Sequence, residues 1–372
     1  MERKLATVRK IAALDPIPGA DAIEVATVDG WKVVTQKGLH KVGDHVIYLE
    51  IDSFLPKGDP RYEFLMKSGV RTFEGVEGHK LRTIKLRGQV SQGLLLPLRE
   101  FIDDFVDSKW DEGQELSEFF FLGADLTEFL GIKKWEAQIP ACLGGLVKGA
   151  FPSFIKKTDQ ERCQNLVTEI FAPVTHADSQ HDEGVERDAE YEISVKLDGT
   201  SVTYYHYNGV VGACSRNLEL KINDENKDNT IVKTLLDSGL FDVLPKLGNV
   251  AIQGELMGPG IQGNREGLKK PKFFIFDIQN LDRSRYFSAR TRSHIMSELA
   301  AQGISKDFVD HVPIIGTEQT LSGLGITNVD ELLKFAEGPS ILHPVREGLV
   351  FKRHDGEFSF KAISNKFLMK DQ

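Results

Sequence analysis

The N-terminal part of the chain alternates between apolar and polar side chains in short runs, a pattern typical of half-buried β-strands. Such runs cover residues 23–26, 31–34, 46–51, 80–86 and 92–96. Asp29 and Gly30 separate the first two runs, and an Asp-Gly pair between apolar runs is a strong signal for a β-hairpin. Short strands at this spacing predict a small barrel or sandwich.

Strand and helix patterns mix in the C-terminal part of the chain, from Tyr191 onward. The run from Ser194 to Val211 predicts a hairpin that turns at Asn208 and Gly209. Further runs predict helices and strands, at 230–240 and 288–301 for the helices and at 251–256, 272–278, 348–353 and 357–362 for the strands. This order indicates an α+β domain with much antiparallel pairing.

An acidic stretch separates the two patterned regions. Asp and Glu crowd residues 103–118, and Phe occupies 119–121, which indicates a helix or a linker. The polar and acidic segment 180–190 reads as a loop. We therefore expect a first domain over residues 1–105, a linker or helical connector over 106–150, and a second domain over 151–372.

The bulk composition is that of a globular protein. Hydrophobic residues make up 41% and charged residues 27% of the 372 positions. No apolar run approaches the ~20 residues that span a bilayer, and the N-terminus lacks the apolar core of a signal peptide. Three scattered cysteines without metal-ligand spacing (Cys142, Cys163 and Cys214) predict reduced thiols in the cytoplasm or nucleus.

The net charge of −9 argues against a protein that coats nucleic acid by bulk attraction. A local basic patch is nevertheless present, because no Asp or Glu interrupts residues 80–99. The candidates for nucleic-acid contact are Lys80, Arg82, Lys85 and Arg87. The alternative interpretation is a solvated strand face.

The stretch Lys196-Leu197-Asp198-Gly199 ends a strand-like run and carries the main candidate for a nucleophile. Alternate side chains of a strand share a face, so Lys196 and Asp198 point the same way. Gly199 lets the backbone turn or approach a ligand closely. The alternative interpretation of Lys196 is a surface lysine before a turn.

Downstream of Lys196, further motifs follow in a meaningful order. They are Ser215-Arg216-Asn217, Gly254-Glu255-Leu256-Met257-Gly258, Phe273-Phe274-Ile275-Phe276-Asp277-Ile278, Glu347-Gly348-Leu349-Val350-Phe351-Lys352 and Phe360-Lys361. Together with Lys-x-Asp-Gly, this set closely resembles the motifs of the covalent nucleotidyltransferases, the superfamily of DNA ligases, RNA ligases and mRNA capping enzymes. The resemblance covers roughly residues 151–370 and implies an antiparallel-sheet-rich nucleotidyltransferase domain, an ATP-grasp-like ligase fold.

The resemblance implies a nucleotide-binding role for four residues. Lys196 would attack the α-phosphorus and carry the nucleotide covalently, which requires a neutral amine. Glu255 would accept hydrogen bonds from the ribose, and Arg216 would hold the ribose or a 5′-phosphate. Phe276 would stack on the base, because a base offers an apolar π-face to an aromatic ring.

The resemblance also implies residues for the metal and the phosphates. Glu347 would hold Mg²⁺ or Mn²⁺, directly or through water, and Asp198 is a second candidate for the metal. Lys352 and Lys361 would contact the α-phosphate and offset its charge in the transition state. Asp198 resembles the carboxylate that acts in the later steps on the polynucleotide.

The last motif departs from the family pattern, which is usually Lys-x-Lys. Lys361 is followed by Ala362 and Ile363, and the next lysine is Lys366. The role of the second lysine is therefore unassigned, and Lys366 is a candidate for it.

The stretch Pro18 to Trp31 resembles the opening of tRNA-binding OB modules, which implies an OB-like RNA-binding domain at the N-terminus. DNA ligases and capping enzymes place an OB domain after the last motif, and nothing of that size follows Lys361 here. The layout instead resembles ATP-dependent RNA ligases with an N-terminal OB domain and a C-terminal nucleotidyltransferase domain.

The reaction implied by the resemblance has three steps. ATP adenylates Lys196, the AMP passes to a 5′-phosphate end, and a 3′-hydroxyl attacks that end and expels AMP. The implied substrate is a nick in duplex RNA, and a monomer is expected. Two alternatives stay open, a DNA ligase or RNA guanylyltransferase with the same chemistry, and a non-catalytic RNA-binding protein built on the OB module.

Overall fold

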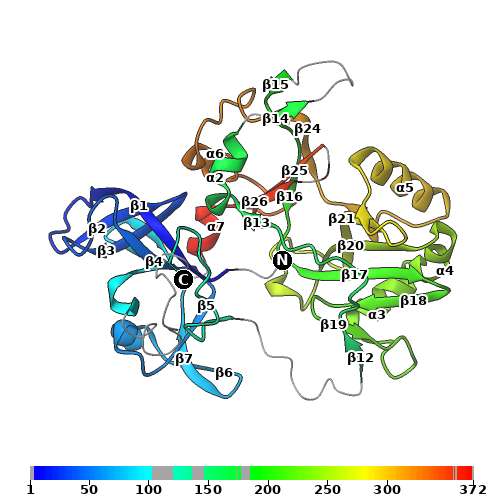
Figure 1. Cartoon of the computed structure of the whole chain (residues 1–372). Helices are drawn as coiled ribbons and strands as arrows, with labels where there is room; N and C mark the ends of the chain where they lie inside the picture. Colours follow the sequence, from blue (N-terminus) through cyan, green and yellow to red (C-terminus); the bar gives the residue numbers. More distant parts are fainter. Residues whose placement is uncertain are drawn as a thin grey trace, which may run out of the picture. The chain divides into compact units, whose positions relative to one another are not determined.

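The computed structural model describes residues 4–102, 120–135, 146–172, 174–176, 185–354, 356 and 358–370 (Figure 1). The chain divides into two compact units, residues 1–139 together with residue 372, and residues 140–371. They are called the N-terminal unit and the C-terminal unit below.

The N-terminal unit is built on a five-stranded antiparallel sheet. In spatial order its strands are β10 (Leu94–Pro97), β4 (His45–Leu49), β1 (Ala6–Pro16), β2 (Ile23–Val28) and β3 (Trp31–Gln36). The predicted hairpin is confirmed, because Val28 pairs with Trp31 and Asp29 adopts a φ of 47° in the turn. The strands bury Trp31 and Tyr48 in a shared core, where their ring centroids lie 5.5 Å apart.

Smaller elements complete the N-terminal unit. A second sheet contains β11 (Lys133–Lys134), β5 (Ser53–Pro56), β7 (Val76–Lys80) and β6 (Arg71–Phe73), a 3₁₀ segment covers Pro60–Ser68, and β8 (Thr83–Leu86) and β9 (Gln89–Gln92) form a hairpin. The expected single strand over 80–86 is wrong, because the chain leaves β7 after Lys80 and starts β8 at Thr83. Arg87, with a φ of 49°, and Gly88 make a turn that the sequence pattern did not indicate.

Residues 120–135 belong to the N-terminal unit, although they fall within the segment expected to be a connector. Phe120, Ala124, Leu126 and Ile132 pack into the core formed by β1 and β4. The acidic residues 103–118 of that segment lie outside the described residues.

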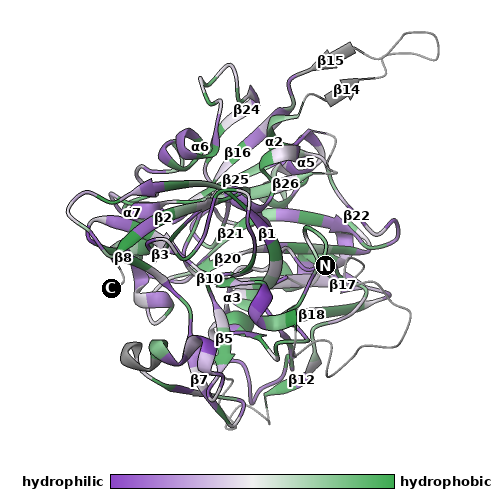
Figure 2. Cartoon of the chain, turned by 60° about the vertical axis from the view of Figure 1, so that its left-hand side comes forward, coloured by the Kyte–Doolittle hydropathy of each residue, from purple (hydrophilic) through white to green (hydrophobic). Residues whose placement is uncertain are grey.

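The C-terminal unit contains a large, mostly antiparallel sheet. In spatial order its strands are β12 (Val147–Ala150), β19 (Leu218–Leu220), β18 (Val210–Cys214), β17 (Thr200–Tyr207), β20 (Val250–Met257), β21 (Lys272–Asn280) and β22 (Arg285–Tyr286), with β23 (Val309–His311) parallel to β21. The predicted turn at Asn208 and Gly209 is confirmed, because both residues have positive φ and the flanking strands pair. Every residue of β20 except Glu255 is buried. Figure 2 shows hydrophobic (green) and hydrophilic (purple) residues mixed along the strands of the chain.

The same unit contains a small sheet of five strands. They are β13 (Glu161–Arg162), β26 (Ser359–Ile363), β25 (Gly348–Arg353), β16 (Glu190–Lys196) and β24 (Ile314–Thr320), and a separate pair joins β14 (Val174–His176) to β15 (Val185–Arg187). The pairs β16–β25 and β25–β26 are antiparallel, and each places its residues directly opposite one another.

Helices cover the two sheets of the C-terminal unit (Figure 1). They are α2 (Val167–Phe171), α3 (Thr230–Asp237), α4 (Leu240–Val243), α5 (Ala289–Ala301), α6 (Val329–Phe335) and α7 (Asn365–Lys370), with 3₁₀ turns at Cys163–Asn165, Leu244–Leu247 and Gln262–Asn264. Apolar residues of α3, α4 and α5 share a core with the large sheet, and those of α2 and α6 share a core with the small sheet. Ser288 caps α5 by accepting a hydrogen bond from the Thr291 amide, which explains where this predicted helix begins.

The α+β prediction is confirmed, with a small β domain followed by a domain rich in antiparallel sheet. No helix in the described part of the chain is long and apolar enough to cross a membrane. Cys163 and Cys214 are buried free thiols, and burial raises the pKa of Cys163 to about 12. Cys142 lies outside the described residues.

Candidate active site

Lys196 is the last residue of β16 and pairs with Gly348 of β25. Tyr191, Ile193 and Val195 point into the core of the small sheet, so strand alternation directs Lys196 to the opposite face. Directly paired residues share a face, and the pairs Glu192–Lys352 and Val350–Lys361 therefore bring Lys352 and Lys361 to the face of Lys196. The sequence could not supply this arrangement, because it depends on strand order.

The amine of Lys196 forms an ion pair with Glu347, which immediately precedes β25. The distance between Lys196 Nζ and Glu347 Oε2 is 2.8 Å. Burial alone would lower the pKa of Lys196, but Glu347, Glu255 and Asp198 outweigh it and raise this pKa above its usual value. The nucleophile candidate is thus held as a cation between carboxylates.

Glu255 lies on β20 and closes the other side of this cluster. Its Oε1 accepts a hydrogen bond from the Gly199 amide at 3.0 Å. A Cβ at Gly199 would lie 2.5 Å from the Leu256 carbonyl oxygen, so this close approach requires glycine. Burial, together with the charge of Glu347, raises the pKa of Glu255 to about 7 although Lys196 opposes the shift.

Phe276 occupies an irregularity in the pairing of β20 with β21. Gln253 pairs with Asp277 and Gly254 with Ile275, which leaves Phe276 as the extra residue of a β-bulge. Phe273 and Phe274 are buried core residues, whereas Phe276 is partly exposed. The bulge thereby leaves Phe276 partly exposed, and this is the ring for which the resemblance of the motifs implies base stacking.

Lys352 contacts both residues of this bulge. Its Nζ donates to the Phe276 carbonyl oxygen at 2.6 Å and lies 2.7 Å from Asp277 Oδ1. Burial lowers the pKa of Lys352, and Asp277 opposes that shift. Asp277 is a site residue that the sequence reasoning missed, although its position directly after Phe276 was visible.

Asp198 and Arg216 each face an opposite charge. Arg265 Nη1 lies 4.0 Å from Asp198 Oδ2, and Arg216 Nη2 contacts both carboxylate oxygens of Asp159 at 3.0 Å. No motif marked Arg265 or Asp159. Arg216 and Asp159 are both about half exposed, so this pair is easily rearranged by a ligand.

The final motif ends differently from the family pattern. Ile363 is 3% exposed and pairs with Gly348, which itself pairs with Lys196, so Ile363 lies on the sheet face of Lys196 and Lys361. The side chain of Lys366 is 66% exposed on α7 and pairs with Glu337 at 2.7 Å. The structure therefore associates Lys361, but not Lys366, with the lysine cluster around Lys196.

The carboxylates near Lys196 are the candidate ligands for a metal ion. Within the described ranges, no three His, Cys, Asp or Glu side chains gather closely enough to hold an ion by themselves. Asp198, Glu255 and Glu347 nevertheless all raise the pKa of one amine, so three carboxylates surround the single cation of Lys196. This arrangement fits a magnesium-like cation that keeps several waters and takes few protein ligands.

The basic residues of the N-terminal unit fall into two groups. Arg82, Lys85 and Arg87 are exposed on or beside the β8–β9 hairpin. Lys80 instead lies 3.9 Å from Asp52 and 5.7 Å from the centre of the Trp135 ring, and burial lowers its pKa. Only three of the four predicted contacts therefore present their charge openly to solvent.

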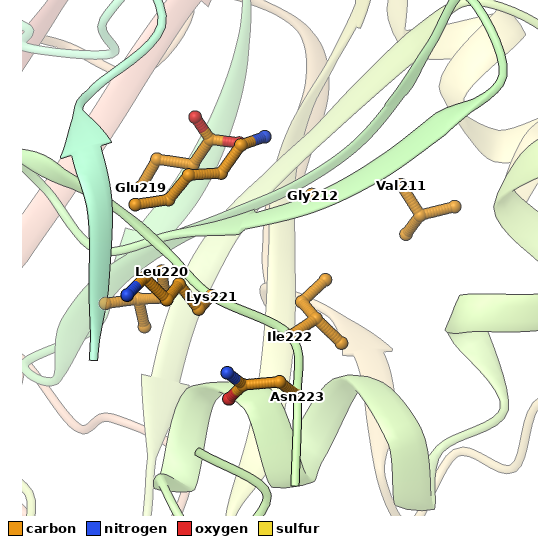
Figure 3. A pocket seen from close by; sticks show the side chains of 8 residues that line it. Val211, Gly212, Glu219, Leu220, Lys221, Ile222 and Asn223 are labelled. Atoms are coloured by element: carbon orange, nitrogen blue, oxygen red, sulfur yellow. The ribbon is translucent and has the colours of Figure 1, made fainter. Parts of the chain in front are cut away.

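A cavity of about 360 Å³ opens elsewhere on the large sheet, beside Glu219, Lys221 and Asn223 (Figure 3). Glu219 accepts hydrogen bonds from Tyr205 Oη at 2.5 Å and from Lys148 Nζ at 2.6 Å. The described residues that line this cavity include none of the sequence-predicted site residues. It is therefore separate from the Lys196 cluster.

Comparisons with known proteins agree with this architecture. Residues 5–98 match a family model described as an OB-fold domain, and residues 189–363 match the RNA ligase family model. No curated protein sequence matches the chain.

Solved structures of the Naegleria gruberi RNA ligase resemble the whole chain. The structure with PPi is 40% identical, has a TM-score of 0.82, and matches over 100% of both chains. A mutant with ATP and Mn is 40% identical with a TM-score of 0.82, over 99% of this chain and 100% of the other. Another mutant with AMP and Mn is 39% identical, also with a TM-score of 0.82 and 100% coverage of both.

The two matched models, an OB-fold domain followed by an RNA ligase domain, place the chain in the class of polynucleotide ligases. Because identity of 40% extends over the full length, the chain belongs to the RNA ligase family.

Proposed function

We propose that this RNA ligase uses ATP to seal 3′-hydroxyl and 5′-phosphate ends, at nicks in duplex RNA, through a lysyl-AMP intermediate on Lys196. The observation that carries the proposal is the position of the Lys196 amine, 2.8 Å from Glu347 and on one sheet face with Lys352 and Lys361. The Naegleria gruberi structures with ATP and Mn, AMP and Mn, and PPi support the choice of nucleotide and metal.

In the first step, the neutral amine of Lys196 attacks the α-phosphorus of ATP. A nitrogen–phosphorus bond forms, the bond from the α-phosphorus to the bridging oxygen breaks, and pyrophosphate leaves with that electron pair. The amine must first lose a proton, because the carboxylates around it raise its pKa. A divalent metal held at Glu347, with Asp198 as a second candidate ligand, would supply positive charge that favours the neutral amine and offsets charge on the phosphates.

The remaining residues of the cluster bind and orient the nucleotide. Phe276 stacks on the base, and Glu255 accepts hydrogen bonds from the ribose. Lys361 and Lys352 offset charge on the α-phosphate. Arg216, released from Asp159, binds the ribose or the 5′-phosphate end with its planar guanidinium.

The later steps act on the RNA. The 5′-phosphate attacks the lysyl-AMP and displaces the lysine, and the 3′-hydroxyl then attacks the activated end and expels AMP. Asp198 acts in these steps. Arg82, Lys85 and Arg87 hold the backbone of the RNA, with a smaller contribution from Lys80.

The decisive experiment incubates the purified protein with α-labelled ATP or GTP and then offers nicked RNA or nicked DNA. We expect label from ATP on Lys196, its transfer to nicked RNA, and no label on Lys196→Ala. Lys233→Ala, which changes an exposed lysine of α3, is the matched control and keeps the label.

Three results would contradict the proposal. Labelling by GTP would indicate a guanylyltransferase, and sealing restricted to all-DNA nicks would indicate a DNA ligase. RNA binding without any labelling would indicate a non-catalytic RNA-binding protein.

A further inference from the structure

Four charged side chains form a buried network next to the proposed nucleotide site. Arg292 of α5 pairs with Glu192 of β16, and its Nη1 lies 3.8 Å from Asp277 Oδ1 of β21. Asp277 in turn pairs with Lys352 of β25 at 2.7 Å. The side chains of Arg292, Glu192 and Asp277 are each less than 10% exposed, at 3%, 8% and 6%.

The network is balanced in charge and joins both sheets of the C-terminal unit. It contains two cations and two carboxylates, and it links β21 of the large sheet to β16 and β25 of the small sheet. A buried ion pair adds little to stability compared with apolar packing of the same volume, because its desolvation is costly. Such a network therefore calls for an explanation beyond stability.

His311 holds the guanidinium of Arg292 from a further side. Arg292 Nε donates to His311 Nε2 at 2.9 Å, and an arginine nitrogen can only donate. His311 must therefore be neutral with its proton on Nδ1, which donates to the Val312 carbonyl oxygen at 2.7 Å. Burial lowers the pKa of His311, which favours this neutral form.

Lys352 connects the buried network to the β-bulge that contains Phe276. One N–H of its ammonium group is directed to Asp277 and another to the Phe276 carbonyl oxygen. An ammonium group has three donors, so one remains for a phosphate. The Phe276 carbonyl belongs to the extra residue of the β20–β21 pairing, whose position the regular ladder does not determine.

We propose that Arg292, Asp277 and Lys352 are positioning residues that hold the Phe276 bulge, so that the ring is pre-set to stack on the base of the bound nucleotide. Arg292 fixes Asp277, Asp277 fixes the Lys352 ammonium, and Lys352 fixes the backbone that carries the ring. The inference rests on the proposed nucleotide role of Phe276, and it assigns Lys352 a role beyond a phosphate contact.

The test compares binding of ATP with binding of inorganic tripolyphosphate, which has the phosphates but no base. Affinities are measured calorimetrically in the full-length Lys196→Ala background, where no adenylation occurs. We expect Asp277→Asn and Arg292→Lys to weaken ATP binding by about tenfold, part of the stacking contribution of one base, and to leave tripolyphosphate binding nearly unchanged. A purely structural network would not change the ratio of the two affinities.

Two controls separate positioning from misfolding. Arg292→Met combined with Glu192→Gln removes one cation and one anion. This double variant breaks the buried network without leaving a net buried charge, and we expect it to lose the preference for ATP over tripolyphosphate to the same extent. Arg290→Met changes an exposed residue of the same helix and is expected to bind both ligands like the parent protein. Thermal unfolding of each variant confirms that it is folded.

The outcomes distinguish this inference from the function on which it rests. If ATP and tripolyphosphate binding fall together, or neither falls, in folded network variants, the positioning role is overturned. If Phe276→Ala itself leaves the preference for ATP intact, the stacking role proposed for Phe276 fails. Absence of ATP-derived label on the wild-type chain would instead refute the proposed function.

Discussion

Lys196 and Glu347 are 151 residues apart in the chain, yet their side chains form an ion pair at 2.8 Å. Antiparallel pairing of β16 with β25 places Lys196 opposite Gly348, the residue after Glu347. A Cβ at Gly348 would lie 2.2 Å from the Ala362 carbonyl oxygen, so β26 closes tightly against this point. This ion pair keeps the Lys196 amine protonated. The reactivity of the amine therefore depends on what else binds to the Glu347 carboxylate.

We expect Glu347→Gln to lower the pKa of Lys196 and nevertheless to slow adenylation. The neutral side chain no longer raises the pKa of the amine, so a larger fraction is unprotonated at pH 8. We expect faster acylation of Lys196 by an amine-reactive reagent, measured by peptide mass spectrometry without nucleotide or metal. Adenylation by ATP should fall by at least about a hundredfold, since the proposed metal ligand is lost. Unchanged acylation of Lys196 would show that Glu347 does not control its protonation.

The rate of adenylation should rise with pH, for the same reason. Because the pKa of Lys196 is raised, the reactive neutral amine becomes more abundant as pH rises. We expect the rate of label uptake from ATP to increase through the neutral and mildly alkaline range, measured in single-turnover experiments. A rate that declines over this range in the folded protein would contradict the assignment of Lys196 as nucleophile.

Glu255→Gln should stabilise the protein while inactivating it. The pKa of Glu255 is raised to about 7 in the folded state, so between the ordinary value of 4.5 and about 7 the folded protein binds a proton that the unfolded chain has released. Stability is therefore lost as pH rises through this window, and the loss persists above it. Gln keeps an acceptor for the Gly199 amide, and we expect a gain of about 1–3 kcal/mol at pH 8, since one pKa unit is worth about 1.4 kcal/mol.

Thermal unfolding at pH 8 and pH 5 tests this prediction. The difference between variant and wild type should shrink at pH 5, where the folded wild type is protonated at Glu255. Equal differences at both values would show that ionisation of Glu255 is not the cause.

Gly199→Ala should disturb the cluster, because its new Cβ would lie 2.5 Å from a backbone oxygen of Leu256. The strand end must shift, which moves Lys196 and breaks the hydrogen bond to Glu255. We expect adenylation to fall by about a hundredfold or more, in line with the sensitivity of catalysis to displacements of about 1 Å. Gly149→Ala is the matched control, because a Cβ there meets nothing within 4 Å, and it should label normally.

Lys361→Ala and Lys366→Ala should differ sharply. Lys361 shares the sheet face of Lys196, whereas Lys366 is an exposed residue paired with Glu337. We expect the first variant to lose most adenylation and the second to stay within about twofold of wild type, since exposed ion pairs contribute little. A large loss in Lys366→Ala would restore Lys366 as the second lysine of the motif.

The exposed hairpin of the N-terminal unit should affect RNA binding without affecting adenylation. Reversing Lys85 and Arg87 to Glu should weaken binding of nicked RNA and reduce its salt dependence by about one unit of slope for each lost phosphate contact. Label uptake from ATP is the internal control and should remain near normal. Lys80→Gln should change the salt slope less, because Lys80 is packed near Asp52 and Trp135.

Local signals in the sequence were sufficient for much of the fold, whereas the candidate site residues came from a resemblance between motifs, and their roles stay predictions. Turn chemistry predicted the hairpins at Asp29–Gly30 and Asn208–Gly209, because those residues tolerate positive φ whatever surrounds them. The order of motifs singled out Lys196, Glu255, Phe276 and Glu347 because it resembles that of the covalent nucleotidyltransferases. The break after Lys80 and the turn at Arg87 were missed, since neither interrupts the apolar–polar pattern.

Tertiary structure alone decided which of these residues meet and what charge they carry. Strand order and register determine the ion pair of Lys196 with Glu347 and the bulge at Phe276. They also determine the buried network that runs from Arg292 to Lys352. Periodicity along a chain determines which face a side chain occupies, but not which distant strand becomes its neighbour. Burial among those neighbours then sets the pKa of each group, so the chemistry of the site emerges only once the sheets have formed.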